Sequence, residues 1–209
     1  MASLSASAGS TIFSGAALGG LTYVGDPGDA QFVAGTPDVA QLYTPDLSVN
    51  GDSPAVFDLS PTGTLDELFG NYRTTTGTTV QPYWAIWVSP AGNTSGYAGD
   101  LEIYTLGGSR LNSSSTIHAF GPGWSDLGGT PDGYWGDTLL QLDAVTYNGQ
   151  PIGDMTLDAI GLEIGDGGSG AGTANINGMM VGSCPDAAST MSLLGIGFGA
   201  FVGLRRRLA

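Results

Sequence analysis

The residues with the clearest catalytic potential in this 209-residue chain are its glutamates, of which there are only three. Two of them, Glu102 and Glu163, stand between apolar residues in strand-like runs, so both should lie on the face opposite those residues. In a concave groove, and about 5 Å apart, such a pair could hydrolyse glycosides with retention of configuration. No glycosidase motif accompanies them. Two solvated carboxylates on an outer surface are therefore the favoured interpretation.

Nucleophilic catalysis is not expected. His118 is the only histidine, it lies in the apolar run Ile117–Phe120, and the sequence has no Gly-x-Ser-x-Gly motif. We therefore expect a structural strand residue rather than a catalytic base. One histidine and one cysteine also disfavour a transition-metal site. The single cysteine, Cys184, excludes an intramolecular disulfide and a Cys-rich zinc site. The chain is predicted not to be an enzyme.

Aromatic residues in a Gly-rich loop, residues 121–137, offer the best candidate for ligand binding. Sugar recognition uses this combination, because C–H faces of the sugar stack on rings while its hydroxyls bond to carboxylates. The competing interpretation is that the tryptophans close the open end of a sandwich, since Trp is highly buried on average, and we favour it. The candidate glycan-binding residues are Trp124, Tyr134, Trp135, Asp126 and Asp137.

Calcium is the ion that the composition favours. It takes six to eight oxygen ligands, which a chain with 16 Asp and many loop carbonyls supplies. Acidic clusters occur at Asp26–Asp29 and Asp166–Gly170, but neither has the spacing of an EF-hand. Because Asp-Gly is first of all a turn signal, turn formation is the default interpretation. No ligand set is assigned, and no other cofactor is expected.

These candidate residues would be positioned by short strands separated by Gly, Pro, Asp and Asn. Asn148–Gly149 lies between two strand-like runs, as in a type I′ hairpin. Trp84 and Trp87 are three residues apart in one run, so they should point to opposite faces of a sheet. The best candidate for a short helix is Leu65–Phe69, which is too brief to affect the fold class. The strand-like runs are Leu21–Val24, Gln31–Ala34, Val39–Tyr43, Val56–Leu59, Tyr83–Val88, Leu101–Leu106, Thr116–Phe120, Leu139–Tyr147, Met155–Ile164 and Ala174–Val181.

Many short strands without a long amphipathic helix predict an all-β fold. Residues 9–183 are expected to form one antiparallel β-sandwich domain, of the jelly-roll type. A chain of this length can bury a core. Its charge excludes one class of partner: residues 1–204 contain two arginines against 19 carboxylates. Binding to a phosphate backbone needs clustered Lys and Arg, so no nucleic-acid partner is expected.

The C-terminal segment differs from the body. Residues 187–204 carry no charge, and Arg205, Arg206 and Arg207 follow at once. As a helix these 18 residues would be about 27 Å long, close to the roughly 30 Å thickness of the bilayer core. The arginine cluster stands where a stop-transfer signal does and predicts a cytoplasmic C-terminus. We expect a C-terminal transmembrane helix.

Just before this helix, a Pro-Asp pair precedes Ser and Thr. The order of Pro185-Asp186, Ser189-Thr190, an apolar span and an arginine cluster resembles the PEP-CTERM class of sorting signals, in its Pro-Asp variant. The resemblance covers residues 184–209, with Cys184 where this variant usually has Val. It implies export by a Gram-negative bacterium that makes exopolysaccharide. It also implies transient anchoring in the inner membrane by the helix, and processing near Pro185-Asp186 by an exosortase-type peptidase.

The body also resembles the jelly-roll domains that precede such tails, whose last strand matches Thr173–Val181. The resemblance implies a fold but little about a reaction or a ligand. At the other end, Met1–Ala8 finishes in Ala6-Ser7-Ala8, like the cleavage region of a secretory signal. Since no basic or apolar segment precedes it, a plain flexible N-terminus is an equal alternative.

The function expected from these features is that of a secreted or cell-surface, noncatalytic β-sandwich protein associated with extracellular polysaccharide matrix. High acidity with few charges in total suits such a location. Two alternatives remain open. One is a carbohydrate-binding module that uses the loop of residues 121–137. The other is a glycoside hydrolase that uses Glu102 and Glu163.

Overall fold

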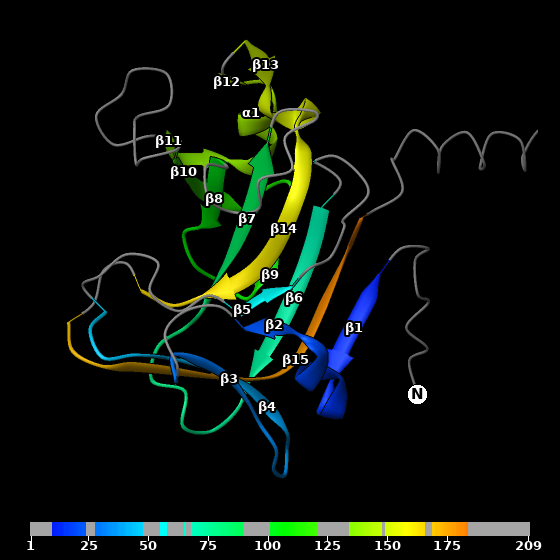
Figure 1. Ribbon diagram of the computed structural model, residues 1–209. Coiled ribbons are helices and arrows are strands. Elements are labelled where there is room, and N and C mark those ends of the chain that lie inside the picture. The colour runs from blue at the N-terminus through cyan, green and yellow to red at the C-terminus, as the bar shows by residue number, and fades with distance from the viewer. Residues whose placement is uncertain are drawn as a thin grey trace, which may run out of the picture.

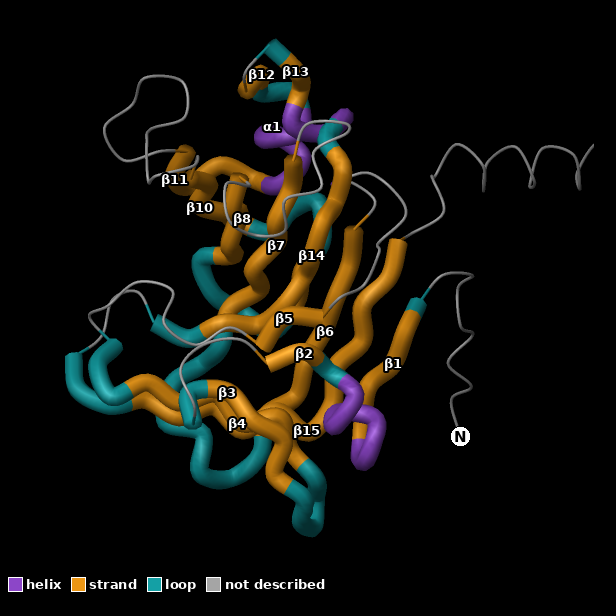
Figure 2. Tube along the Cα trace, viewed as in Figure 1, coloured by secondary structure: helices purple, strands orange, loops and turns teal. Residues whose placement is uncertain are grey.

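A computed structural model describes residues 10–23, 28–47, 55–57, 65, 68–89, 101–120, 134–147, 149–165 and 169–183. Over these ranges the chain forms two antiparallel sheets that pack face to face as a β-sandwich (Figure 1). Strands dominate, and the helical segments are short (Figure 2). The predicted β-sandwich is confirmed. The predicted helix over residues 187–204 lies outside the described residues.

The six-stranded sheet is organised around β15, which is central and 12 residues long. One edge of β15 pairs first with β4 and then with β1, and the other edge pairs with β6. The start of β1 therefore lies beside the end of β15, with Thr11 opposite Val181 (Figure 1). The strands are β1 (Thr11–Ser14), β3 (Ala30–Val33), β4 (Val39–Thr44), β6 (Leu68–Thr74), β9 (Arg110–Leu111) and β15 (Gly172–Ser183).

The seven-stranded sheet has the order β11-β10-β8-β7-β14-β5-β2. Its middle strand, β7, is buried along its whole length, which explains why its sequence is apolar on both faces. The strands are β2 (Thr22–Tyr23), β5 (Ala55–Phe57), β7 (Tyr83–Ser89), β8 (Leu101–Thr105), β10 (Thr116–Phe120), β11 (Tyr134–Thr138) and β14 (Thr156–Glu163).

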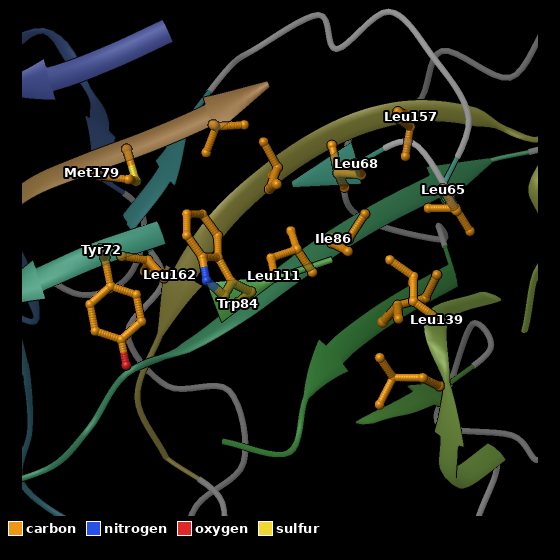
Figure 3. Close-up of a cluster of buried hydrophobic side chains, with 14 of the residues drawn as sticks. Leu65, Leu68, Tyr72, Trp84, Ile86, Leu111, Leu139, Leu157, Leu162 and Met179 are labelled. Carbon is orange, nitrogen blue, oxygen red and sulfur yellow. The ribbon is translucent and has the colours of Figure 1, made fainter. Parts of the chain in front are cut away.

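The core between the sheets is built around Trp84, which is fully buried among aliphatic side chains (Figure 3). Its indole N–H donates a hydrogen bond to the Ser109 carbonyl at 3.2 Å. Its ring centroid lies 6.0 Å from that of Tyr72, whose hydroxyl donates to the Pro82 carbonyl. Trp87 belongs to a separate cluster on the other face of β7. The predicted opposite orientation of Trp84 and Trp87 is confirmed.

Strand β6 was not predicted. The short helix considered over Leu65–Phe69 is wrong for Leu68 and Phe69, which already belong to β6, whereas Leu65 has a 3-10 conformation. The alternation of inward residues in β6 is interrupted by Gly70, which hides the strand from a pattern search. The physical reason is the core tryptophan: a Cβ on Gly70 would lie 2.7 Å from the Trp84 ring. The indole occupies the space that a side chain at position 70 would need.

The strand expected over Leu139–Tyr147 is wrong in its first half, which forms the helix α1 (Leu139–Asp143). Thr138 caps this helix in a capping box with Gln141, a local signal that overrides strand propensity. The hairpin at Asn148–Gly149 is confirmed: β12 (Thr146–Tyr147) pairs with β13 (Gln150–Pro151), and Gly149 has a φ of 84°. Two 3-10 helices, η1 (Gly15–Gly20) and η5 (Ile152–Asp154), complete the described elements.

Candidate functional site

The candidate reactive residues gather on the outer face of the seven-stranded sheet, the face turned away from the core. Their neighbours along each strand, such as Ile86 and Ile103, point into the core, so alternation sends these residues outward. The set comes from four adjacent strands. It consists of Tyr83 and Trp87 on β7, Glu102 and Tyr104 on β8, His118 on β10, and Glu163 on β14.

Four of these residues form a continuous row across the sheet. Glu163 lies opposite Tyr83 in the register of β14 and β7. The Tyr83 and Tyr104 rings have centroids 5.2 Å apart, and the Tyr104 ring meets the His118 ring edge-on at 5.0 Å. Tyr104 Oη and His118 Nδ1 share a hydrogen bond of 2.6 Å. We call this set, Tyr83, Tyr104, His118 and Glu163, the buried polar row.

The buried polar row has almost no contact with water. Glu163 is 3% exposed, and His118 and Tyr104 are each 5% exposed. The expectation that Glu102 and Glu163 are both solvated is therefore wrong for Glu163, while Glu102 is half-buried. Burying polar groups costs free energy unless they are hydrogen-bonded, and the Tyr104–His118 hydrogen bond meets this condition for two members of the row.

The two glutamates lie in different register rows of the sheet, on strands that are not neighbours. Glu102 lies in the register row of Trp87, whereas Glu163 lies in the row of Tyr83, four residues away along β7. Strands β8 and β14 flank β7, so the separation is about 13 Å along the strands and about 10 Å across them. The Cα atoms are thus about 16 Å apart by register. Side chains stand roughly perpendicular to a sheet, so this spacing does not favour the carboxyl separation of about 5 Å that retaining enzymes use.

The predicted glycan-binding residues are only partly within the described chain. Trp124 and Asp126 lie outside it. Tyr134, Trp135 and Asp137 belong to strand β11 and not to a loop, which corrects the expected boundary of residues 121–137. Trp135 occupies the register position opposite His118, although the side chains of Tyr134 and Trp135 lie outside the described part. Asp137 is half-buried.

A second polar arrangement, which the sequence did not reveal, lies on the outer face of the six-stranded sheet. Gln31 Nε2 donates to Gln41 Oε1 at 2.9 Å, and Gln41 Nε2 donates to Asn175 Oδ1 at 2.9 Å. Asn175 Nδ2 donates in turn to the Thr76 carbonyl at 3.4 Å. Three amides from β3, β4 and β15 thus form an amide ladder. The only trace of the ladder in the sequence is that Gln31 and Gln41 each stand between apolar residues in a strand. Asn175, which Gln41 contacts, is 134 residues away along the chain.

Metal binding finds no support among the described side chains. No three His, Cys, Asp or Glu residues come together there as a metal site would require. Of the two acidic clusters, Asp29 is described and directly precedes β3, while Asp26 and Asp166 lie outside the described residues. A calcium site therefore stays a prediction.

The C-terminal segment provides the match to a known family. Residues 184–208 match the VPDSG-CTERM motif. The chain carries a VPDSG-CTERM sorting signal. This signal is a PEP-CTERM-like exosortase signal, and it implies that the protein is processed by an exosortase-type enzyme and exported to the cell surface. No curated protein and no solved structure matches the chain.

The VPDSG-CTERM signal confirms the resemblance drawn from the sequence, and it includes every residue assigned there to processing and stop-transfer. These residues, which lie outside the described part of the chain, are Pro185, Asp186, Ser189, Thr190, Arg205, Arg206 and Arg207. The signal begins at residue 184, immediately after Ser183, the last residue of β15. No spacer separates it from the central strand of the sandwich. Among the described residues, no helix combines the length and apolar character needed to span a bilayer.

Proposed function

We propose that this protein is a noncatalytic, jelly-roll-like component of the surface of a Gram-negative bacterium, retained in extracellular polysaccharide. In this proposal the C-terminal helix anchors it transiently in the inner membrane until an exosortase processes the tail. The observation that carries the proposal is the match of residues 184–208 to the VPDSG-CTERM motif, directly after β15. A sorting signal joined to a folded sandwich delivers that sandwich outside the cell.

The composition supports an extracellular role. The chain has a net charge of −14, with only five basic residues, and three of these belong to the sorting signal. A protein with so few cations has little attraction for nucleic acid or for anionic lipid headgroups. It remains soluble through its own negative charge. Retention in a matrix would then depend on hydrogen bonds and apolar contacts with neutral groups.

The absence of catalysis in this proposal is supported by the outer face of the seven-stranded sheet. The Cα atoms of Glu102 and Glu163 are about 16 Å apart by register, a spacing that does not favour the carboxyl separation of about 5 Å in retaining glycosidases. His118 is 5% exposed, and its Nδ1 atom is hydrogen-bonded to the Tyr104 hydroxyl. Such a contact holds neighbouring strands together and gives a substrate no access.

Cell fractionation in the native host tests the proposal. The protein should be found in the matrix fraction of wild-type cells and in the inner-membrane fraction of cells that lack the exosortase. A Pro185→Ala, Asp186→Ala double variant should behave in wild-type cells like the protein in the deletion strain, and Leu140→Ala, a surface change on α1, should not. Finding the wild-type protein in the cytoplasm, or washed free of the matrix into the medium, would contradict the proposal.

A further inference from the structure

We propose that the outer face of β3, β4 and the first half of β15 binds a neutral polysaccharide. This inference rests on the proposed function, because it names the ligand class and the surface that would hold the protein in its matrix. The residues that carry it are Asp29, Gln31, Gln41, Tyr43, Thr173 and Asn175. We call this set the amide face.

The register of the three strands places the amide face on one side of the sheet in two adjacent rows. In one row Gln41 lies opposite both Gln31 and Asn175. In the next row Tyr43 lies opposite Thr173, and its backbone N–H donates to the carbonyl of Asp29. Leu42 and Ala174, which lie between these rows, are buried in the core, so alternation turns both rows outward.

The amide ladder fixes the orientation of its side chains before any ligand arrives. A primary amide has two N–H donors and an oxygen with two lone pairs. In the ladder Gln41 uses one donor toward Asn175 and one lone pair toward Gln31. Its second donor and second lone pair remain for a ligand, in a geometry set by the ladder. Hydroxyl groups, which donate and accept at once, match such a surface, and the preset orientation lowers the entropic cost of binding.

Tyr43 supplies an apolar surface beside these amides. It is 38% exposed, which places it among the most exposed large apolar side chains of the described part. A tyrosine ring presents a flat apolar body with a polar tip, and it loses little conformational entropy when it binds. A sugar ring meets both requirements, since its C–H face would cover the aromatic ring while its hydroxyls reach the adjacent amides.

Charge selects a neutral polysaccharide over an acidic one. The whole chain carries a net charge of −14, and the amide face contributes a carboxylate but no cation. A uronic-acid polymer would be repelled by this field. The amide face also lacks the large apolar core that stabilises protein–protein interfaces, because its members other than Tyr43 are polar. A neutral glycan is therefore the favoured occupant.

Affinity electrophoresis of the protein recovered from its native host tests the proposal. The gels contain dextran or a neutral β-glucan, with alginate gels as the acidic comparison. The neutral polysaccharides should retard the wild-type protein, and alginate should not. Tyr43→Ala and Gln41→Leu should each weaken binding by about tenfold or more, as expected for the central anchors of an interface. Tyr43→Phe, which keeps the ring, should retain most of the binding.

Leu140→Ala is the matched control, because it removes another exposed apolar side chain, 54% exposed, from α1 in a different part of the fold. Its mobility should equal that of the wild type, and thermal melts should show that all variants are folded. Gln31→Ala, at an exposed end of the amide ladder, provides a second test if Gln41→Leu fails to fold.

Equal retardation of the wild type, Tyr43→Ala and Gln41→Leu would overturn the assignment of the site. If Tyr43→Ala is nevertheless retained in the matrix of the host like the wild type, the proposed function stands and only the site fails. If the wild type itself is not retained in the matrix, the proposed function fails. Loss of matrix retention in the variants, without retardation of the wild type in any gel, would overturn the glycan ligand and indicate a protein partner.

Discussion

The seven-stranded sheet buries the polar row on its outer face, whereas the six-stranded sheet leaves its amide face in contact with water. Tyr104 and His118 on the first are each 5% exposed, while Tyr43 on the second is 38% exposed. Both faces arise from the same alternation of inward apolar and outward polar residues. Alternation therefore decides which residues leave the core, and it does not decide whether they reach solvent.

The face with titratable residues is also not the face that presents polar groups to solvent. Histidine and glutamate titrate and catalyse in many enzymes, yet His118 and Glu163 belong to the buried polar row here. The amide ladder of Gln31, Gln41 and Asn175 contains no titratable group, and it is the arrangement that presents hydrogen-bonding groups outward. Accessibility, more than reactivity, distinguishes the buried polar row from the proposed binding surface.

The largest expected difference between the faces concerns one tyrosine from each. Tyr104→Ala should lower the free energy of unfolding by about 3–5 kcal/mol, because it empties a buried site. Tyr43→Ala should change it by about 0.5 kcal/mol, as surface substitutions usually do. Urea unfolding of the two variants measures both values. Equal losses would show that the two faces are not distinguished by burial.

A smaller change removes only the hydroxyl group of Tyr104 from the buried polar row. Tyr104→Phe abolishes the 2.6 Å hydrogen bond between Tyr104 and His118, so we expect a loss of about 1–3 kcal/mol in the free energy of unfolding. Because His118 is the only histidine, its imidazole signals in an NMR spectrum report on this contact directly. Tyr43→Phe is the control and should leave those signals in place. Unshifted imidazole signals in Tyr104→Phe would argue against the contact.

Alkaline pH should weaken the core beneath both faces. Burial raises the pKa of Tyr72 to about 12, from an ordinary value of 10.0. The pKa of Tyr72 in the folded state lies above that in the unfolded state. The free energy of unfolding linked to this hydroxyl is therefore fully retained below pH 10 and is lost as pH rises toward 12. The loss should be on the order of 1–3 kcal/mol, with solvent screening included. Melting temperatures of the wild type between pH 9 and 12 should fall more steeply than those of Tyr72→Phe.

The smallest effect is expected from the amide ladder. Gln41→Leu removes two hydrogen bonds at a half-exposed position, and since water replaces such bonds, the free energy of unfolding should fall by less than about 1 kcal/mol. Urea unfolding measures this change. A loss as large as that of Tyr104→Ala would mean that the ladder is needed for folding and would weaken its assignment to ligand binding.

Much of the fold could be predicted from the sequence, because the strands and the hairpin at Asn148–Gly149 depend on local patterns. The opposite orientation of Trp84 and Trp87 follows from parity alone. What could not be predicted depends on contacts between distant residues. Gly70 conceals β6 because the Trp84 indole fills the space above it. Helix α1 replaced a predicted strand because a four-residue capping box outweighed the apolar pattern.

The candidate sites also differ in whether they depend on local sequence or on contacts between distant residues. The sorting signal could be recognised because its order of residues is contiguous, over residues 184–208. The outward direction of Glu102 and Glu163 followed from their neighbours, but their separation depends on the register of β8, β7 and β14. The amide ladder was missed altogether, since Gln41 and Asn175 are 134 residues apart and neither has a motif around it.

Intact-mass spectrometry of the protein recovered from the surface of its native host tests whether the tail is removed. We expect a chain that keeps the sandwich through Ser183 and ends near Pro185, so that the apolar segment and Arg205–Arg207 are missing. The same measurement on cells that lack the exosortase should return the unprocessed C-terminus. Surface protein that still carries Arg205–Arg207 in a host with an active exosortase would show that the sorting signal is not processed.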